Sequence, residues 1–316
     1  MARISNPNER GDRTLAKLNT LESTKVHRCL LFGPPKTGKT LLAGKLAEFY
    51  NLIWVDFENG YETLFQLPTA YQERIELITI PDTRSYPMAI ETGLKMVKQP
   101  CVICEAHGKV GCMICQRENT PVINTDLPNL RDLDTVVVFD SMTQLTNSAI
   151  ANITKAEADD YKLDYDDWGN LGKLLDIFLS HIQQSGYHVI VISHEIEAKT
   201  EGKKARLVPV AGTRNFSRNC AKYFDHIVYC EVKNRKHTFT SSTTASTNIL
   251  TGSRTGIAIE NATAEASLLQ IFKPDLYPTP DAPVVTLSTK KVKPKPKSTG
   301  GVSALSVLAK LKEKQK

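Results

Sequence analysis

Residues 33–40 have the residue types and spacing of a loop that binds phosphate groups. They read Gly-Pro-Pro-Lys-Thr-Gly-Lys-Thr, so two glycines enclose four residues and a Lys-Thr pair follows. In such a loop the backbone N–H groups point at phosphate oxygens, the lysine reaches the terminal phosphates, and the hydroxyl can bind Mg²⁺. We therefore predict that the phosphates of a nucleoside triphosphate are held by Gly33, Pro34, Pro35, Lys36, Thr37, Gly38, Lys39 and Thr40.

Two acidic residues at the ends of apolar runs could complete such a site. Asp140 closes the run 136–139. A phosphate-binding loop needs an acid at the end of a second buried strand, where it joins Thr40 around Mg²⁺. Glu58 follows the run 52–57, and a carboxylate placed there could polarise the attacking water. A solvated loop carboxylate is the alternative for Glu58.

Four of the seven cysteines fall into two Cys-x2-Cys pairs that are separated by seven residues. This grouping is typical of metal binding, since four thiolates can close a tetrahedral site around Zn²⁺. Such a site leaves no position open for catalysis, which indicates a structural ion. A redox-active dithiol pair and unmetallated thiols are the alternatives. The predicted zinc ligands are Cys101, Cys104, Cys112 and Cys115.

The segments that must position these residues alternate between strand and helix patterns. Short β-rich runs predict strands over 26–32, 52–57, 75–80, 135–139 and 189–193, with shorter ones over 227–232, 236–240 and 256–260. Apolar residues at helical spacing predict helices over 39–50, 88–97 and 168–184. This alternation is typical of a mostly parallel sheet flanked by helices, so we expect an α/β fold.

The composition is that of a globular protein, with 41% hydrophobic and 23% charged residues. The apolar runs are far shorter than the roughly 20 residues that a bilayer requires. Residues 1–11 are polar, unlike a signal peptide. We expect a cytoplasmic protein without a membrane partner.

The net charge of +6 is concentrated at the carboxyl end of the chain. Residues 290–316 contain nine lysines and one glutamate, a net charge of +8, so the remaining residues carry −2.

The predicted organisation is an amino-terminal segment (1–24), a core (25–273) with a cysteine-rich insertion (99–132), a Pro/Lys-rich linker (274–301) and an amphipathic helix (302–316). That helix presents Ala304, Leu305, Leu308 and Leu311 on one face and could dock on a partner protein.

The order of these segments resembles that of the RecA-like core ATPases, and in particular of the small RecA/RadA-like recombination ATPases encoded by phages. The resemblance covers about residues 25–270. It implies a RecA-like P-loop fold, ATP and Mg²⁺ as cofactors, and assembly into a homo-oligomer. The matching segments are 33–40, Val55-Asp56-Phe57-Glu58, Ile80-Pro81-Asp82-Thr83, Val138-Phe139-Asp140-Ser141 and residues 189–195, Val-Ile-Val-Ile-Ser-His-Glu.

The resemblance also assigns roles to single residues. It implies that Glu58 is the catalytic glutamate, that Asp140 is the acid associated with Mg²⁺, and that His194 senses the γ-phosphate at a strand end. His194 departs from the glutamine usual in RecA, although a neutral imidazole can still donate one hydrogen bond. Arg254, in Gly-Ser-Arg-Thr-Gly, resembles an arginine that related subunits send into a neighbour's ATP site. The family's preceding lysine is missing, and a plain β-turn arginine is the alternative.

In such proteins two loops face DNA, and their equivalents here are 143–165 and 197–215. The first is acidic and is not assigned to DNA. The second is basic, with a solvated charged loop as the alternative; its residues are Lys199, Lys203, Lys204, Arg206 and Arg214. We expect an ATPase acting on single-stranded DNA in recombination or annealing. A DnaB-like helicase or loader and a nucleotide-gated scaffold are the alternatives.

Overall fold

The computed structural model describes residues 26–158, 160–200, 203–241, 248–255, 262–263 and 267–273. The chain divides into two units, residues 1–279 and 280–316. The predicted amino-terminal segment, the strand over 256–260, the linker over 274–301 and the helix over 302–316 lie outside the described residues. Among the helices of the described ranges, none combines the length and the apolar character that a membrane crossing requires.

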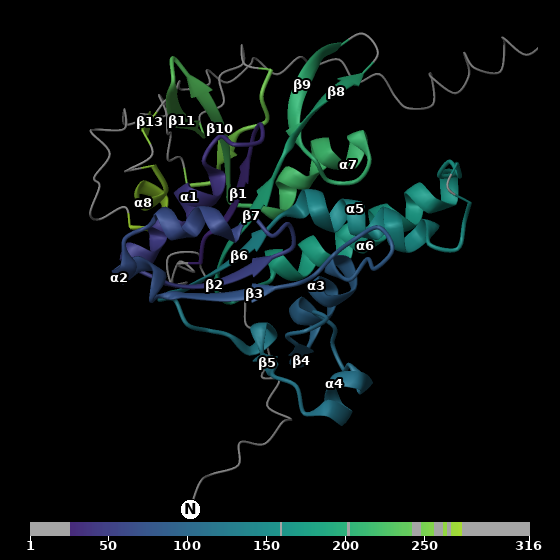
Figure 1. The fold of residues 1–316 in the computed structure, drawn as a ribbon. Coiled ribbons are helices and arrows are strands. Elements are labelled where there is room, and N and C mark those ends of the chain that lie inside the picture. The colour runs from purple at the N-terminus through teal and green to yellow at the C-terminus, as the bar shows by residue number, and fades with distance from the viewer. Residues whose placement is uncertain are drawn as a thin grey trace, which may run out of the picture. The chain divides into compact units, whose positions relative to one another are not determined.

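The main sheet has the strand order β13-β11-β10-β1-β7-β6-β2-β3 (Figure 1). Its central strands pair in parallel, which confirms the predicted α/β fold. They are β1 (Arg28–Phe32), β2 (Asn51–Asp56), β3 (Ile75–Thr79), β6 (Thr135–Asp140), β7 (His188–Ser193) and β10 (His226–Lys233). Three short strands extend or flank one edge in antiparallel pairing: β11 (Lys236–Thr240), β12 (Gly252–Ser253) and β13 (Ala262–Thr263).

Alternate residues of the central strands enter two separate cores. Leu30 and Phe139 belong to the core formed with α3 (Ala89–Lys98), α5 (Met142–Thr154) and α6 (Tyr165–Gln183). Leu31 and Val138 belong to the core on the other face, with α1 (Lys39–Gly44), η2 (Lys45–Glu48) and α8 (Ser267–Phe272). Because both faces are covered, these strands are continuous apolar runs rather than alternating ones.

Two hairpins branch from this sheet. The first, β4 (Cys101–Cys104) and β5 (Val122–Thr125), encloses α4 (Met113–Glu118) and forms the cysteine-rich insertion. The second, β8 (Glu195–Thr200) and β9 (Lys203–Pro209), replaces the loop expected over 197–215 and leads to α7 (Arg214–Asn219). Shorter helical segments are η3 (Tyr61–Gln66), α2 (Thr69–Gln72), η4 (Leu127–Asn129) and η5 (Cys220–Tyr223).

Three histidines lie together at the amino ends of β1, β7 and β10. The backbone N–H of His27 donates to Nδ1 of His188 at 3.0 Å, and Nδ1 of His27 lies 3.2 Å from Nε2 of His226. His188 and His226 are buried. Burial, and then the charge of neighbouring His27, lower the pKa of each of these two histidines to about 4. The fold therefore favours their neutral forms.

We expect His188 and His226 to lower the free energy of unfolding as the pH drops from about 6.5 to about 4, since these two side chains take up protons in the unfolded chain and not in the folded one. Buried Asp140, whose pKa is raised to about 7, acts in the opposite direction, so the histidine contribution is read from the difference between wild type and a histidine variant. Above pH 6.5 the contribution of His188 and His226 is complete. The loss should be a few kcal/mol, at about 1.4 kcal/mol for each pKa unit. Urea unfolding at pH 7.5, 6 and 5 measures it. His226→Asn should flatten the profile and exposed His181→Asn should not; identical profiles for wild type and His226→Asn would contradict this account.

Candidate nucleotide-binding site

The loop over 33–40 connects β1 to α1, as its sequence predicts, and its backbone needs glycine at two positions. At Gly33 the φ angle is 152° and a Cβ atom would lie 2.0 Å from the carbonyl oxygen of Cys230. Gly38 has a φ angle of 83° and directly precedes α1. Only glycine fits at these two positions without strain or a steric clash. With glycine there, the loop can take the conformation in which its N–H groups point at a bound anion.

Lys39 is buried against its own loop. Its Nζ atom donates to the carbonyl oxygens of Gly33 at 3.0 Å and of Pro34 at 2.7 Å. Burial lowers the pKa of the ammonium group, and the nearby carboxylates of Asp140 and Glu58 oppose this shift. A cation held by neutral carbonyl oxygens can exchange them for charged phosphate oxygens, which are stronger acceptors.

Thr40 and Asp140 meet, although 100 residues separate them. The Thr40 hydroxyl donates to Oδ2 of Asp140 at 3.0 Å. Asp140 is the last residue of β6 and is 3% exposed. Burial, and then the charges of Glu58 and Asp56, raise its pKa to about 7. A hydroxyl and a carboxylate are oxygen ligands of the kind that Mg²⁺ prefers, and a cation there would favour the ionised carboxylate, so this pair fits the predicted magnesium site.

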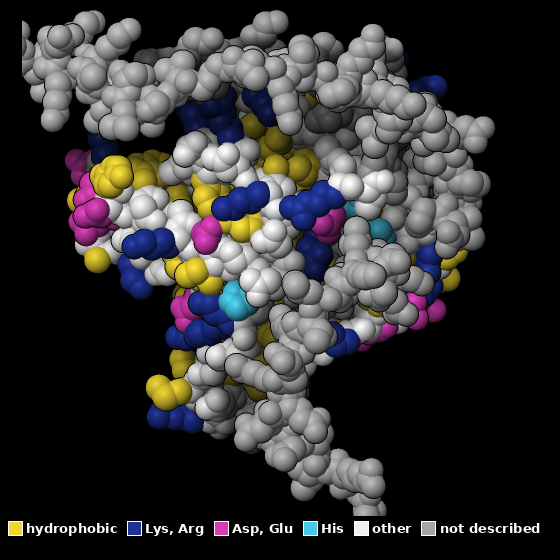
Figure 2. Space-filling view, turned by 180° about the vertical axis from the view of Figure 1, so that it is seen from behind, with side chains coloured by type: hydrophobic (Ala, Val, Ile, Leu, Met, Phe, Trp, Pro, Cys, Tyr) yellow, Lys and Arg dark blue, Asp and Glu magenta, His cyan; other side chains and the backbone are white. Residues whose placement is uncertain are grey.

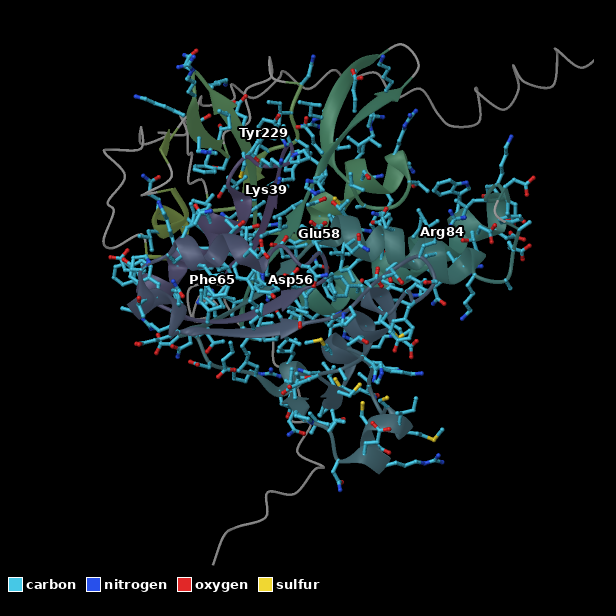
Figure 3. The ribbon with its side chains drawn as sticks, in the orientation of Figure 1. Lys39, Asp56, Glu58, Phe65, Arg84 and Tyr229 are labelled. Carbon is cyan, nitrogen blue, oxygen red and sulfur yellow. The ribbon has the colours of Figure 1, made fainter. Side chains whose placement is uncertain are left out.

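Glu58, which Figure 3 shows near Lys39 and Asp56, contacts two side chains that follow other strands. The hydroxyl of Ser141 donates to its Oε1, and Nε2 of His194 lies 3.7 Å from its Oε2. Burial alone would raise the pKa of Glu58, but the nearby imidazole of His194, the hydrogen bond from Ser141 and the charge of Lys39 lower it. The carboxylate is thus ionised and oriented, and at 27% exposure it remains open to water.

Asp56 and Thr143 support these groups and are not among the predicted site residues. Fully buried Asp56 accepts hydrogen bonds from the backbone N–H groups of Glu58 at 2.8 Å and Tyr61 at 3.0 Å, which fixes the turn that carries Glu58. The Thr143 hydroxyl accepts from the backbone N–H of His194 at 2.8 Å. Asp56 is visible in the Val-Asp-Phe-Glu segment, whereas nothing local in the sequence marks Thr143.

His237 of β11 is a third supporting residue. Its Nδ1 lies 3.0 Å from the carbonyl oxygen of Thr37, so Nδ1 must carry the hydrogen of this bond. A Cβ atom at Gly38 would lie 3.2 Å from the same ring nitrogen. The imidazole therefore packs directly on the loop. The 200 residues between His237 and Thr37 explain why no local sequence pattern indicates this contact.

The structure distributes the residues predicted to bind DNA over the second hairpin and α7. Nζ of Lys199 lies 3.9 Å from Oε2 of Glu197, and Nη2 of Arg206 donates to the carbonyl oxygen of Ile249 at 3.3 Å. Lys203 and Lys204 belong to β9, with side chains outside the described ones, and Arg214 begins α7. Figure 2 shows one face of the molecule, on which Lys and Arg side chains lie in separate groups with hydrophobic and acidic ones between them.

Arg254 lies away from the P-loop of its own chain. Its Nη1 pairs with Oδ1 of Asp225 at 3.3 Å, and its Nη2 donates to the carbonyl oxygen of Lys222 at 2.6 Å. Asp225 immediately precedes β10, at the amino ends of the parallel strands, whereas the P-loop follows the carboxyl end of β1. Arg254 therefore does not reach the phosphates of its own site, and insertion into a neighbour's site stays a prediction.

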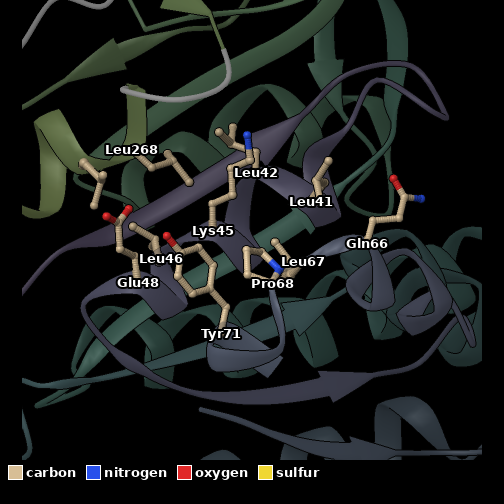
Figure 4. A pocket seen from close by; sticks show the side chains of 11 residues that line it. Leu41, Leu42, Lys45, Leu46, Glu48, Gln66, Leu67, Pro68, Tyr71 and Leu268 are labelled. Atoms are coloured by element: carbon tan, nitrogen blue, oxygen red, sulfur yellow. The ribbon is translucent and has the colours of Figure 1, made fainter. Parts of the chain in front are cut away.

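A hollow of about 440 Å³ lies on the outer side of α1 and is distinct from the nucleotide site (Figure 4). Its wall consists mainly of leucines from α1, from the segment 66–71 and from α8, with Lys45 and Glu48 as the charged residues. Neither Glu58 nor Asp140 lines it. We therefore do not assign the nucleotide to this hollow.

The cysteine-rich insertion brings together three of the four predicted zinc ligands. The ligand atoms of Cys104, Cys112 and Cys115 lie within 4.8 Å of one another, and the fourth member of the group is His107. The structure does not bring Cys101 into this group, since its Sγ lies 3.1 Å from the hydroxyl of Thr125 instead. Residues three apart on a strand point to opposite faces, so β4 cannot direct both Cys101 and Cys104 into one site.

Comparisons with solved structures give distant similarities. The RadB recombinase matches with 19% identity and a TM-score of 0.35, over 68% of this chain and 79% of that one. An ATPase of the type III secretion system of pathogenic bacteria matches with 12% identity and a TM-score of 0.38, over 66% of this chain and 52% of that one. A search of curated proteins finds no match.

A protein-family model described as an AAA domain matches residues 25–255, which is well over half of the chain. The matched range contains the P-loop, Glu58, Asp140 and His194, the residues that the fold gathers at the carboxyl ends of the strands. The parallel sheet and this loop make the matched range a P-loop domain. The chain belongs to the AAA domain family.

Proposed function

We propose that the protein hydrolyses ATP at this site and uses the reaction to control its hold on single-stranded DNA. The observation that carries the proposal is the convergence of Lys39, the Thr40–Asp140 pair and the Glu58–His194 pair around one loop. Phosphate binding alone requires only Lys39 and the Thr40–Asp140 pair. An oriented, ionised and water-accessible carboxylate is what hydrolysis adds to that requirement.

ATP binding would begin at the P-loop. Its backbone N–H groups and the amino terminus of α1 would cradle the phosphates, and Nζ of Lys39 would leave the carbonyls of Gly33 and Pro34 for the β- and γ-phosphate oxygens. Thr40 and Asp140 would hold Mg²⁺, which when bound neutralises phosphate charge. Glu58 follows the end of β2 and lies near enough to Lys39 for the two charges to interact, so it would stand near the terminal phosphate that Lys39 binds.

Hydrolysis would then depend on Glu58. Its carboxylate accepts a proton from the attacking water, while Ser141 and His194 hold its two oxygens in position. The His194 imidazole can hydrogen-bond either Glu58 or a γ-phosphate oxygen. Exchange between these partners would report the presence of the γ-phosphate, as the predicted sensor role requires.

His194 also stands at the base of the hairpin that carries the predicted DNA residues. It lies between β7 and β8, and its carbonyl oxygen accepts from the backbone N–H of Val210 at 2.9 Å. A shift of His194 toward the γ-phosphate would therefore move both ends of this hairpin. That connection supports coupling between nucleotide and DNA, in which ATP orders the hairpin on the strand and hydrolysis releases it.

We assign this activity to recombination or annealing of phage type, carried out by a homo-oligomer in the cytoplasm. A DnaB-like helicase or loader would use the same site and differ in unwinding duplex DNA. A nucleotide-gated scaffold would bind ATP without DNA-dependent turnover. Glu58 and its orientation by two side chains favour the enzymatic functions over the scaffold.

The test is ATP turnover with and without oligo-dT, on the wild type and on a Lys199→Gln/Lys203→Gln variant. We expect DNA to stimulate the wild type several-fold, and the variant to keep its basal rate while losing stimulation. Each lysine lost from a phosphate contact should reduce the slope of the logarithm of DNA affinity against the logarithm of salt concentration by about one. Exposed Lys173→Gln is the matched control. Turnover unaffected by DNA would contradict the DNA assignment, and no turnover at all would favour the scaffold.

For the cysteine-rich insertion we propose a bound zinc ion. Thiolate sulfur and imidazole nitrogen are preferred zinc ligands, and the three cysteines of the cluster are buried. Four protein donors leave no position open to substrate, so the ion would stabilise the insertion rather than catalyse a reaction.

A further inference from the structure

The metal-binding group of the insertion combines three sulfur atoms with one imidazole nitrogen. Nδ1 of His107 lies 3.1 Å from Sγ of Cys115 and 3.8 Å from Sγ of both Cys104 and Cys112. Four donors at these separations surround a centre of the size that a tetrahedral ion with Zn–S bonds of about 2.3 Å and Zn–N bonds of about 2.1 Å occupies. The inference rests on the proposed zinc and is independent of the proposed ATP hydrolysis.

Local backbone structure explains why these four side chains converge. Cys104 ends β4, and the turn that follows is closed by a bond from the N–H of Gly108 to the carbonyl oxygen of Cys104 at 2.9 Å. His107 lies within that turn. Cys112 caps the amino end of α4 and Cys115 lies in its first turn, so both point from one face of the helix. The ligand pattern is thus Cys-x2-His followed by Cys-x2-Cys.

Cys101 belongs to the core of the domain instead. It pairs with Thr125 across the β4–β5 hairpin and is 7% exposed within the large apolar core. Burial raises the pKa of its thiol, although the Thr125 hydroxyl opposes the shift. A neutral thiol on the far side of the strand does not compete with His107 for the metal.

The turn that carries His107 packs against α3 and the segment that follows β3. The hydroxyl of Thr92 in α3 donates to the carbonyl oxygen of Gly108 at 2.7 Å, in a buried position. Gly108 has a φ angle of 58°, and a Cβ atom there would lie 2.7 Å from Cδ of Pro81 and 3.0 Å from Cα of Ile80. The metal-binding turn therefore contacts both α3 and the segment after β3.

That segment in turn supports the amino end of α5, beside the catalytic residues. Oδ1 of Asp82 accepts from the backbone N–H of Ala89, and its Oδ2 accepts from Nε2 of Gln144, both at 2.7 Å. The backbone N–H of Gln144 donates to Oγ of Ser141, the residue that holds Glu58. A chain of contacts thus runs from the metal-binding turn to the end of β6.

We infer that Cys104, His107, Cys112 and Cys115 form a closed Cys₃His zinc site that fastens the insertion to α3 and to the segment 80–82. The ion holds His107 and Cys104 in one turn, and that turn positions Gly108 against Ile80 and Pro81. Loss of the ion frees the turn and loosens the elements that it contacts, while the P-loop, on the other side of β2, keeps its own contacts.

The ligand set is tested by metal content and by cobalt spectra of protein purified under reducing conditions. We expect one zinc per chain in the wild type and in Cys101→Ser, and at least about 100-fold weaker binding in His107→Ala, since a closed site cannot spare a ligand. In the Co²⁺-substituted His107→Cys variant, a fourth thiolate should raise the thiolate-to-cobalt absorption by about one third over the wild type. Zinc lost from Cys101→Ser but kept by His107→Ala would overturn the assignment, and no zinc in the wild type would overturn the site.

The fastening is tested by hydrogen exchange of the full chain before and after zinc removal with a chelator. Backbone N–H groups of α3 and of residues 80–92 should exchange at least about tenfold faster without the ion, while those of α1 and β1 should be unchanged. His107→Ala should reproduce the chelated pattern and Cys101→Ser the wild-type one. Unchanged exchange in α3 after complete zinc removal would overturn the fastening role. Because neither measurement uses ATP turnover, an inactive P-loop leaves both results interpretable.

Discussion

Glu58→Gln should bind ATP with wild-type affinity and hydrolyse it at least about 100-fold more slowly. The amide keeps the size of the carboxylate and one acceptor oxygen for the Ser141 hydroxyl, so the turn anchored by Asp56 should remain in place. What the amide cannot do is accept a proton from water. Single-turnover hydrolysis with saturating ATP, next to equilibrium binding of a fluorescent ATP analogue, separates the two effects.

Glu62→Gln is the matched control, because Glu62 is an exposed glutamate four residues further along the same segment. It should hydrolyse ATP at the wild-type rate. His194→Ala provides a second comparison: it removes a partner of Glu58 without removing the base, so a loss of roughly tenfold, smaller than that of Glu58→Gln, is expected. Normal hydrolysis by Glu58→Gln would show that another group activates the water.

Much of the nucleotide site could be predicted because it depends on local sequence and on one rule of parallel sheets. The run before Asp140 and the run before Glu58 are buried strands, and parallel strands bring their carboxyl ends to the same edge as the P-loop. Proximity of Thr40, Glu58 and Asp140 then follows from the topology alone. The structure adds the supporting contacts of Asp56, Thr143 and His237, which depend on pairing between distant strands.

The remaining differences arise where a local pattern has two physical outcomes. A basic segment after β7 is compatible with an open loop, but Lys203–Pro209 pairs with Glu195–Thr200 as an antiparallel hairpin. Likewise, a Cys-x2-Cys pair in a turn or a helix can direct both thiols to one metal ion. In a strand the two thiols point to opposite faces of the sheet. The apolar residues Val102 and Ile103 make the first pair a strand, and this removes Cys101 from the site and leaves the fourth position to His107.

Lys39→Ala should lose both ATP-dependent stabilisation and turnover, with turnover reduced at least about 100-fold. The folded state without nucleotide should be little affected. Burial of the ammonium group is unfavourable, as its lowered pKa indicates, and the carbonyl of half-buried Pro34 can accept from water once the ammonium group is gone. The free energy of unfolding without ATP should therefore stay within about 1 kcal/mol of the wild type.

With a non-hydrolysable ATP analogue and Mg²⁺ at about 100 times the dissociation constant, wild-type unfolding should cost about 2.7 kcal/mol more, and Lys39→Ala should gain almost nothing at that concentration. Lys45→Ala is the matched control, since this lysine lies six residues further along, at the start of η2 and beside the leucine-lined hollow. It should show the full stabilisation. If Lys39→Ala is instead stabilised as much as the wild type, the nucleotide binds at another site. The hollow beside Lys45 would then be the first candidate. A nucleotide bound there would make Lys45→Ala the variant that loses stabilisation.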